Sequence, residues 1–172
     1  EQLKWAIYKL SVEAYWDWTV SPMRMVYKPT GQVILFRGLD KVEKPKSLKI
    51  SSGYFKYLWF EELTEFAGVE EIRNVKQSVI RGTDKRTITF ASYNPPKNAN
   101  NWVNVEVEIP NPDRYVHHST YLDVPPEWLG EDFIALAEHT KLTRPDAYRH
   151  EYLGEVIGTG GQVFDNITLR KI

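Results

Sequence analysis

Two adjacent carboxylates, Glu61 and Glu62, directly follow the short apolar run Tyr57–Phe60. Such a run is typical of a strand covered on both faces in a parallel sheet, and α/β proteins bind ligands at the carboxyl ends of these strands. Glu61 could hold Mg²⁺ there through a water molecule, because Mg²⁺ gives up its hydration shell reluctantly. Glu62 could orient or deprotonate an attacking water. This arrangement has the form of the Walker B motif of nucleotide hydrolases.

The same two acids are compatible with two further roles. Acids that follow an apolar run often begin a helix, where they interact favourably with the helix dipole. The acids could also serve a hydrolase that uses no nucleotide, with Glu61, Glu62 or Asp123 as its carboxylate. Neighbouring residues of a strand point to opposite faces, so Glu61 and Glu62 are poorly placed to act as a glycosidase-like pair. A strand end suits two separate roles better.

The composition limits the classes of protein to which the chain can belong. Its 172 residues are 42% apolar, which is enough for one domain with a core, or for one domain and a tail. The net charge of -1 means that any contact with DNA would need a local basic patch. The absence of cysteine excludes disulfides, zinc-thiolate sites and thiol nucleophiles. We find no signal peptide and no membrane-spanning apolar run, so we expect a soluble intracellular protein.

The first fifty residues contain a predicted helix and a predicted hairpin. Apolar residues at helical spacing predict an amphipathic helix over residues 1–14, with no capping residue before it. Two β-rich runs, residues 23–28 and 32–37, are joined by a proline and a glycine and predict a hairpin. The following loop is either a small phosphate-binding patch or a solvated loop, and its basic residues are Lys41, Lys44, Lys46 and Lys49.

The two carboxylates belong to a predicted βαβ unit. Residues 64–80 show the apolar spacing of a helix, which Gly82 would end. Residues 87–91 form a β-branched strand that ends in a second polar cluster, containing Ser92 and Asn94. A right-handed βαβ unit places the carboxyl ends of both strands at one edge of the sheet. The sequence therefore predicts that both glutamates lie close to this polar cluster.

The remainder of the chain predicts strands, then helices, then a linker. The alternation over residues 102–109 predicts a half-exposed strand, and residues 115–121 are a second strand candidate. His117 and His118 in that second strand would face opposite sides, so a metal role is not favoured. A helix is predicted from Pro125 onward, interrupted at Gly130, and a helical turn is predicted over residues 148–153. Residues 158–161 are glycine-rich and linker-like.

Five short phrases, taken in order, resemble the large terminase subunit of tailed bacteriophages, the motor that packages DNA into the capsid. Their order and spacing follow that family from one end of the chain to the other. The phrases are Phe-Arg-Gly-Leu-Asp at 36–40, Leu-Trp-Phe-Glu-Glu at 58–62, Phe-Ala-Ser-Tyr-Asn-Pro at 90–95, His-Ser-Thr-Tyr-Leu-Asp at 118–123, and Tyr148 with Tyr-Leu-Gly-Glu at 152–155.

This resemblance implies an ATPase with ATP and Mg²⁺ as cofactors and a P-loop NTPase-like sheet flanked by helices. Glu61 matches the Walker B acid, which would hold Mg²⁺ through water, and Glu62 matches the catalytic glutamate. Ser92 and Asn94 match the coupling motif, which would sense the γ-phosphate and pass the signal on.

An arginine finger would stabilise the charge of the transition state at the γ-phosphate. Arg37 and Arg81 are the candidates in this sequence, and a surface salt bridge is the alternative role for each.

The sequence departs from the family pattern at both ends. The Walker A loop of the family precedes the segment that matches residues 1–14, and no Gly-Lys-Ser or Gly-Lys-Thr is present. The family's nuclease domain would begin near residues 158–161. The resemblance thus implies that residues 1–157 are the C-terminal two-thirds of the ATPase domain and residues 158–172 a linker toward a nuclease domain. We expect this chain alone to hydrolyse ATP poorly. The family also has a helix near residues 102–109, where the alternation favours a strand.

The resemblance further implies a function and partners. The motor would couple ATP hydrolysis to translocation of double-stranded DNA into the procapsid, gripping the DNA through its backbone regardless of sequence. Its partners would be the small terminase subunit, the portal protein and further copies of itself, in the bacterial host cytoplasm and transiently on the procapsid. A non-catalytic nucleic-acid-binding module remains the alternative, in which the hairpin, the lysine loop and the aromatic residues bind single strands.

Overall fold

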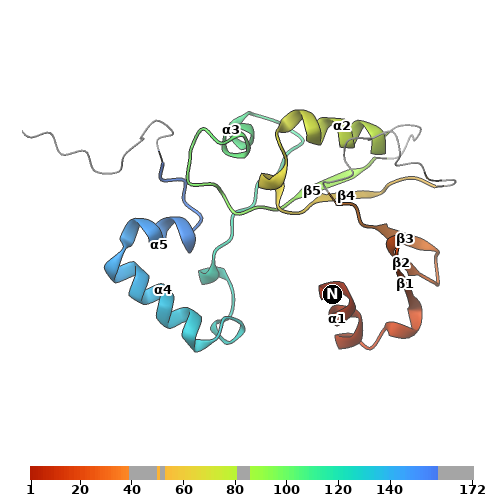
Figure 1. The fold of residues 1–172 in the computed structure, drawn as a ribbon, viewed down its shortest axis with the longest axis horizontal. Helices are drawn as coiled ribbons and strands as arrows, with labels where there is room; N and C mark the ends of the chain where they lie inside the picture. Colours follow the sequence, from red (N-terminus) through yellow and green to blue (C-terminus); the bar gives the residue numbers. More distant parts are fainter. Residues whose placement is uncertain (39–49, 51–52, 81–85, 159–172) are drawn as a thin grey trace, which may run out of the picture. The chain divides into compact units, whose positions relative to one another are not determined.

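The chain divides into two compact units, residues 1–47 and residues 48–172, which we describe separately. The structure is a computed structural model that describes residues 1–38, 50, 53–80 and 86–158 (Figure 1). None of the helices in these described ranges has the length and apolar character needed to cross a membrane. Both units contain helices and strands, so the predicted mixed α/β class is confirmed.

The first unit is a helix packed with an antiparallel sheet. The sheet has the strand order β1-β2-β3, and the register pairs Trp18 with Met25. A contact of 6.2 Å between ring centroids joins Tyr8 of the helix to Trp18, while Ile7 and Met25 are buried. The elements are α1 (Gln2–Lys9), η1 (Glu13–Tyr15), β1 (Trp16–Val20), β2 (Met23–Tyr27) and β3 (Gln32–Leu35).

The predicted hairpin is confirmed, and the predicted first helix is too long. β2 and β3 pair antiparallel, and Gly31 in their turn takes a φ of 70° that favours glycine. The helix α1 has no side-chain cap, as expected, but it ends at Lys9 because Ser11 leaves the helical region with a φ of 53°. The strand β1 was not predicted, although Trp16, Trp18 and Val20 follow the period of two of a strand.

The second unit is built around the predicted strand, helix and parallel strand, which are confirmed, although the helix begins at Val69 and not at residue 64. β4 (Tyr57–Phe60) pairs in parallel with β5 (Ile88–Ala91), and α2 (Val69–Val79) connects them and lies beside the pair (Figure 1). The register joins Phe60 to Ala91 at the carboxyl ends of the strands. Phe60 is only 4% exposed and packs edge-on against Phe66, with 5.3 Å between ring centroids. Burial of this ring anchors the end of β4.

The prediction that β4 is covered on both faces is wrong for the described residues. Phe60 is buried on one face, while Tyr57 and Trp59 are 61% and 67% exposed. Both rings approach Phe90, itself 50% exposed, at centroid distances of 6.1 and 6.5 Å. An aromatic run reads as continuously apolar in the sequence, but its rings can still divide between a covered and an exposed face.

Residues 102–109 form the helix α3 (Trp102–Glu108), so the strand prediction is wrong. The side-chain oxygen of Asn101 accepts a hydrogen bond from the backbone N–H of Val103, at 3.2 Å, and thereby caps the helix. Val103 is almost fully buried, and Trp102 donates its indole N–H to the carbonyl of Phe66 at 3.1 Å. The alternating residues are compatible with a strand or with a helix. The cap at Asn101 and the contacts of Trp102 and Val103 stabilise the helix.

Residues 115–121 do not form the second predicted strand either. In the described part of the chain they lie in an irregular segment that ends in η5 (Tyr121–Asp123). Thr120 and Asp123 form a capping box there, with the Asp123 carboxylate 2.6 Å from the Thr120 backbone nitrogen. His118 is hydrogen-bonded through Nε2 to the carbonyl of Leu153 at 2.9 Å. Hydrogen bonds between side chains and the backbone therefore take the place of the backbone hydrogen bonds that a β-strand would form with a neighbouring strand.

The helices near the end of the chain follow the prediction. Gly130, with a φ of 82°, interrupts the helical segment, and Gly154, with a φ of 66°, follows the last helix. Tyr121, Phe133, Tyr148 and Tyr152 pack ring against ring, and a 2.8 Å hydrogen bond between the hydroxyls of Tyr121 and Tyr148 raises the pKa of Tyr121. The elements are η6 (Pro126–Trp128), α4 (Glu131–Thr143) and α5 (Pro145–Glu151); the last begins earlier than the predicted turn over residues 148–153.

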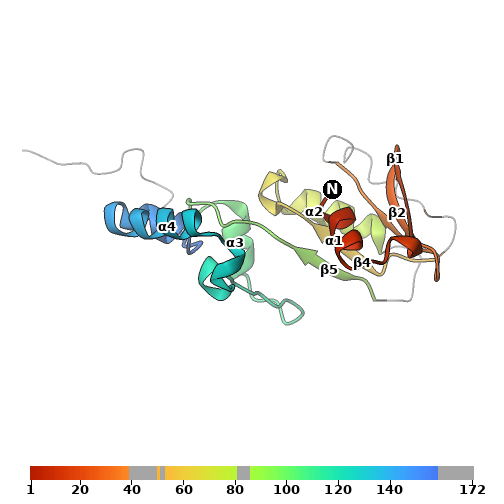
Figure 2. The same ribbon diagram turned by 90° about the horizontal axis from the view of Figure 1, so that it is seen from below.

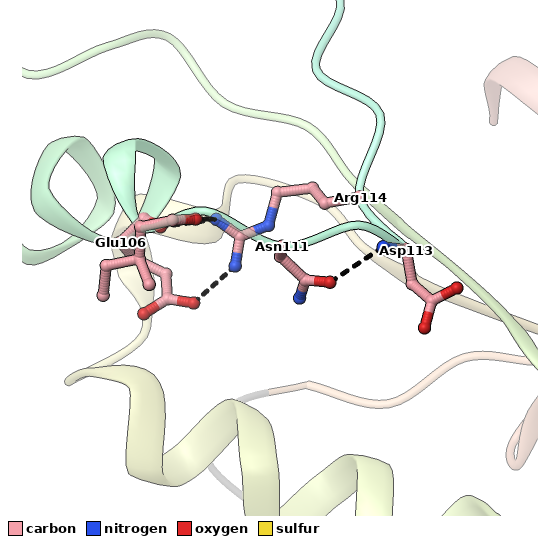
Figure 3. A network of polar contacts seen from close by, with 5 residues as sticks. Glu106, Asn111, Asp113 and Arg114 are labelled. Atoms are coloured by element: carbon pink, nitrogen blue, oxygen red, sulfur yellow. Dashed lines mark hydrogen bonds and ion pairs between the residues drawn. The ribbon is translucent and has the colours of Figure 1, made fainter.

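The end of α3 is fixed by a polar network (Figure 3). The Arg114 guanidinium donates to the Glu106 carboxylate at 2.6 Å and to the Glu106 backbone carbonyl. The side chains of this pair are only 25% and 32% exposed, so solvent screens the pair less than an ordinary surface salt bridge. Asn111 accepts from the Asp113 backbone N–H at 3.0 Å and stabilises the turn before Arg114.

One substitution tests the helical placement of α3. Asn104 is 8% exposed and donates through Nδ2 to the carbonyls of Pro96 and Asn98, both at 2.9 Å. Asn104→Asp keeps the shape but sets a carboxylate against two carbonyl oxygens, so we expect the free energy of unfolding at neutral pH to fall by about 2 kcal/mol. Urea unfolding of the chain measures this. Asn74→Asp on the exposed face of α2 is the control, and equal losses for the two variants would contradict the placement.

Candidate functional site

The backbone of Ser92 forms hydrogen bonds to residues on both sides of the two carboxylates, Phe60 at the end of β4 and Leu63. Its backbone N–H donates to the carbonyl of Phe60 at 3.0 Å, and its carbonyl accepts from the backbone N–H of Leu63 at 3.0 Å. These bonds connect the end of β5 to residues on either side of Glu61 and Glu62. The sequence prediction that these three site residues share one edge of the sheet agrees with these contacts.

The pairing around Ser92 encloses one residue more than a regular ladder. In a regular parallel pair, the N–H and C=O of one residue bond to positions that flank a single residue of the neighbouring strand. Here they flank two, Glu61 and Glu62, which is the arrangement of a β-bulge. The extra residue is accommodated because Glu62 takes the left-handed conformation, with φ 50° and ψ 60°. The strict alternation expected of neighbouring strand residues therefore does not extend through this pair.

A left-handed glutamate is strained, since this region costs a residue with a Cβ roughly 1–2 kcal/mol. Such outliers persist where surrounding contacts fix them, and they concentrate at functional sites. The Leu63 N–H bond to Ser92 and the short helix η4 (Leu63–Glu65), for which Glu62 is the N-cap, fix the conformation here. The outlier lies at the residue that the sequence assigns to water activation.

The carboxylates of Glu61 and Glu62 are both exposed. Within the described residues, no three histidine, aspartate or glutamate side chains gather into a metal-binding cluster. Mg²⁺ in nucleotide sites is held by one or two carboxylates together with waters and phosphate oxygens, rather than by an all-protein cage. Glu61 and Glu62 are the two exposed carboxylates at this sheet edge that could make such a contact.

Asn94, the other residue of the predicted polar cluster, is less closely connected to the two glutamates than Ser92. Beyond β5 the chain continues as an extended segment toward α3 (Figure 2). Asn94 in that segment is exposed. No hydrogen bond between described residues joins Asn94 to either glutamate. Tyr93, which the sequence analysis did not single out, is half-buried, and burial raises its pKa, with Arg114 acting in the opposite direction.

Of the two arginine candidates, the structure describes Arg37. Arg37 belongs to the first unit, is exposed, and donates to the carbonyl of Phe36 at 2.7 Å. Arg81 lies outside the described residues, as do the four lysines of the loop after the hairpin. Neither arginine is assigned a role by the structure.

The carboxylate of Asp123 already has a structural role. It accepts from the backbone N–H and the hydroxyl of Thr120, at 2.6 and 3.1 Å, and these bonds lower the pKa of Asp123. A carboxylate committed to a capping box is a weak candidate for the nucleotide-independent hydrolase that the sequence left open.

Trp59 is a residue of the site that the sequence analysis did not identify. Its indole N–H donates to the hydroxyl oxygen of Ser92 at 3.1 Å, across the β4–β5 pair. Trp59 lies two positions after Tyr57, and Ser92 lies two positions after Phe90. Residues spaced by two share a face of a strand, and this spacing is the only sign of the contact in the sequence.

These features define the class as a mixed α/β protein whose βαβ unit sets two carboxylates and a serine at one sheet edge. The family described as phage terminase large subunit matches residues 1–155. The chain is also 42% identical over 176 residues to a terminase large subunit of Bacillus phage SPP1, in an alignment that covers 99% of this chain and 41% of that protein. The chain therefore belongs to the phage terminase large subunit family. It spans about 41% of the length of this relative.

The strain at Glu62 can be measured by comparing two small residues. Glycine adopts the φ of 50° without steric cost, so we expect Glu62→Gly to be more stable than Glu62→Ala by about 1 kcal/mol. The same pair at Glu61, which has no positive φ, should show the reverse order, because glycine there only adds entropy to the unfolded chain. Urea unfolding of the four variants checks this. A Glu62→Gly variant less stable than Glu62→Ala would rule out the bulge.

Proposed function

We propose that this chain is part of the ATPase of a viral DNA-packaging motor, in which ATP hydrolysis drives double-stranded DNA into a procapsid. The observation that carries the proposal is the connection of Ser92 to the segment of Glu61 and Glu62 in a chain of the terminase large subunit family. Phosphoryl transfer needs groups that position water and metal beside groups that contact the phosphates, and this edge of the sheet supplies both kinds.

Each residue has a separate task in this mechanism. Mg²⁺, when bound with ATP, would neutralise charge on the β- and γ-phosphate oxygens. The Glu61 carboxylate would hold the metal through a water, and the Glu62 carboxylate would accept a hydrogen bond from the attacking water and take its proton. The Ser92 hydroxyl and the Asn94 amide would donate to γ-phosphate oxygens. Loss of the γ-phosphate after hydrolysis would remove those acceptors and release the segment beyond β5.

We further infer that β4 and β5 belong to a P-loop NTPase-like sheet. Parallel sheets normally have both faces covered, whereas Tyr57, Trp59 and Phe90 are exposed on the described pair. The phosphates would need a Gly-rich loop whose backbone N–H groups surround them, and this sequence contains no Gly-Lys-Ser or Gly-Lys-Thr. In this proposal residues 1–157 are the C-terminal two-thirds of the ATPase domain, residues 158–172 are a linker toward a nuclease domain, and the isolated chain hydrolyses ATP poorly.

The proposal includes partners that follow from the family. The motor would grip double-stranded DNA through its phosphates and assemble with the small terminase subunit, the portal protein and copies of itself in the host cytoplasm. A non-catalytic nucleic-acid-binding module is the second candidate, and the exposed aromatic face of Tyr57, Trp59 and Phe90 favours it, because exposed rings can stack on bases.

The test is ATP turnover by the complete protein that carries this sequence. Glu62→Gln keeps the size of the side chain but removes the base, so we expect kcat to fall by at least about 100-fold while ATP binding persists. Glu65→Gln, in the neighbouring η4, is the matched control and should retain turnover.

Two outcomes would contradict the proposal. Turnover unchanged by Glu62→Gln would place the catalytic base elsewhere. No turnover in the wild type, combined with single-strand binding that depends on salt but not on Mg²⁺ or nucleotide, would favour the non-catalytic module.

A further inference from the structure

The indole of Trp59 and the hydroxyl of Ser92 meet on one face of the β4–β5 pair. Trp59 is paired with Phe90 in the parallel register, and Ser92 lies two residues beyond Phe90. Because strand side chains alternate, these three residues share a face. The Trp59 Nε1 to Ser92 Oγ distance is 3.1 Å, a normal hydrogen bond between residues 33 positions apart in the chain.

The direction of this hydrogen bond is fixed by chemistry. The indole N–H can only donate, so the Ser92 oxygen must accept. A serine hydroxyl has one hydrogen to donate and two lone pairs. The bond occupies one lone pair and orients the hydroxyl, so that its hydrogen points away from the indole and stays available to another acceptor. Phosphate oxygens are acceptors, so a hydrogen bond from Ser92 to a phosphate oxygen needs this hydrogen.

We propose that Trp59 is a positioning residue that holds the Ser92 hydroxyl ready to donate to a phosphate oxygen of the nucleotide. This inference rests on the proposed ATPase function. Trp59 itself touches neither substrate nor metal in this role. Its side chain acts through Ser92, whose backbone is already fixed by the Phe60 and Leu63 hydrogen bonds, so the indole restrains the side chain of a serine with a fixed backbone.

The exposure of Trp59 allows a role in positioning Ser92 to be distinguished from a role in stabilising the fold. Trp59 is 67% exposed, and its hydrogen bond to Ser92 is exposed as well. A solvent-exposed hydrogen bond contributes little to folding, because water replaces the lost partner. Removing the indole N–H should therefore leave the thermal unfolding of this chain nearly unchanged, so a lower kcat in Trp59→Phe is not explained by a loss of stability.

The first experiment measures kcat and KM for ATP in the complete protein. Trp59→Phe keeps an aromatic ring but removes the donor, and we expect kcat to fall about tenfold with KM changed less than about threefold. Ser92→Ala should lower kcat at least as much, and the double variant should match Ser92→Ala alone, because the two residues act as one unit. Trp128→Phe, at a tryptophan that is 77% exposed in η6, should match the wild type.

The outcomes separate this inference from the function on which it rests. If Glu62→Gln abolishes turnover but Trp59→Phe does not lower kcat, the ATPase proposal stands and the role of Trp59 is overturned. Effects of Trp59→Phe and Ser92→Ala that multiply in the double variant also overturn it, since Trp59 would then act independently of Ser92. If Glu62→Gln leaves turnover intact, the proposed function fails and this inference fails with it.

A second measurement does not depend on activity. In nitrogen-15 spectra of the chain, the indole N–H of Trp59 can be assigned from its loss in Trp59→Phe. We expect this signal to shift and its exchange with water to accelerate in Ser92→Ala, while the Trp128 indole signal stays unchanged. A Trp59 signal with the same position and exchange rate in Ser92→Ala would show that the bond does not form in solution, which overturns the proposal.

Discussion

The site depends on two backbone hydrogen bonds of Ser92, which lie on either side of Glu61 and Glu62. The Ser92 N–H and C=O bond to Phe60 and Leu63 and so enclose Glu61 and Glu62. This pairing requires the parallel register of β4 and β5, which the crossover through α2 produces. It also requires Phe60 to stay buried against Phe66, because that contact anchors the last residue of β4. A shift of register by one residue would separate the serine from the acids and exchange the two faces of the strand.

The segment beyond Ser92 is hydrogen-bonded to other parts of the second unit. Asn104 of α3 donates to two carbonyls of this segment, and residues 97–99 exchange hydrogen bonds with Gly158, at 2.8 Å from the Gly158 N–H to the Lys97 carbonyl. A Cβ on Gly158 would lie 2.8 Å from that same carbonyl oxygen, so the close approach of the two backbones requires a glycine. The polar strand end is therefore connected through short backbone contacts both to α3 and to the segment that enters residues 159–172.

The sequence predicted those parts of the fold for which residue propensities, apolar spacing and turn residues all indicate the same element. The βαβ unit combines an aromatic strand and a strand with β-branched residues with a helix of clear period, and the hairpin has a glycine where the turn needs a positive φ. The alternating residues of α3 fit two periods, and the decision came from the Asn101 cap and from Trp102 reaching the distant Phe66 carbonyl. The left-handed Glu62 could not be predicted from sequence, because glutamate disfavours that conformation and a partner almost thirty residues away imposes it. The candidate acids were found from their position at the end of an apolar run, whereas Trp59 was missed because its role lies in a contact across the sheet.

The most direct test of this account is an experimental structure of the complete protein with Mg²⁺ and a non-hydrolysable ATP analogue. The account predicts the metal within one water of the Glu61 carboxylate, the Ser92 hydroxyl within hydrogen-bond distance of a γ-phosphate oxygen, and Glu62 still at positive φ. A nucleotide bound away from the carboxyl ends of β4 and β5, or a Ser92 no longer paired on both sides of the glutamates, would contradict it.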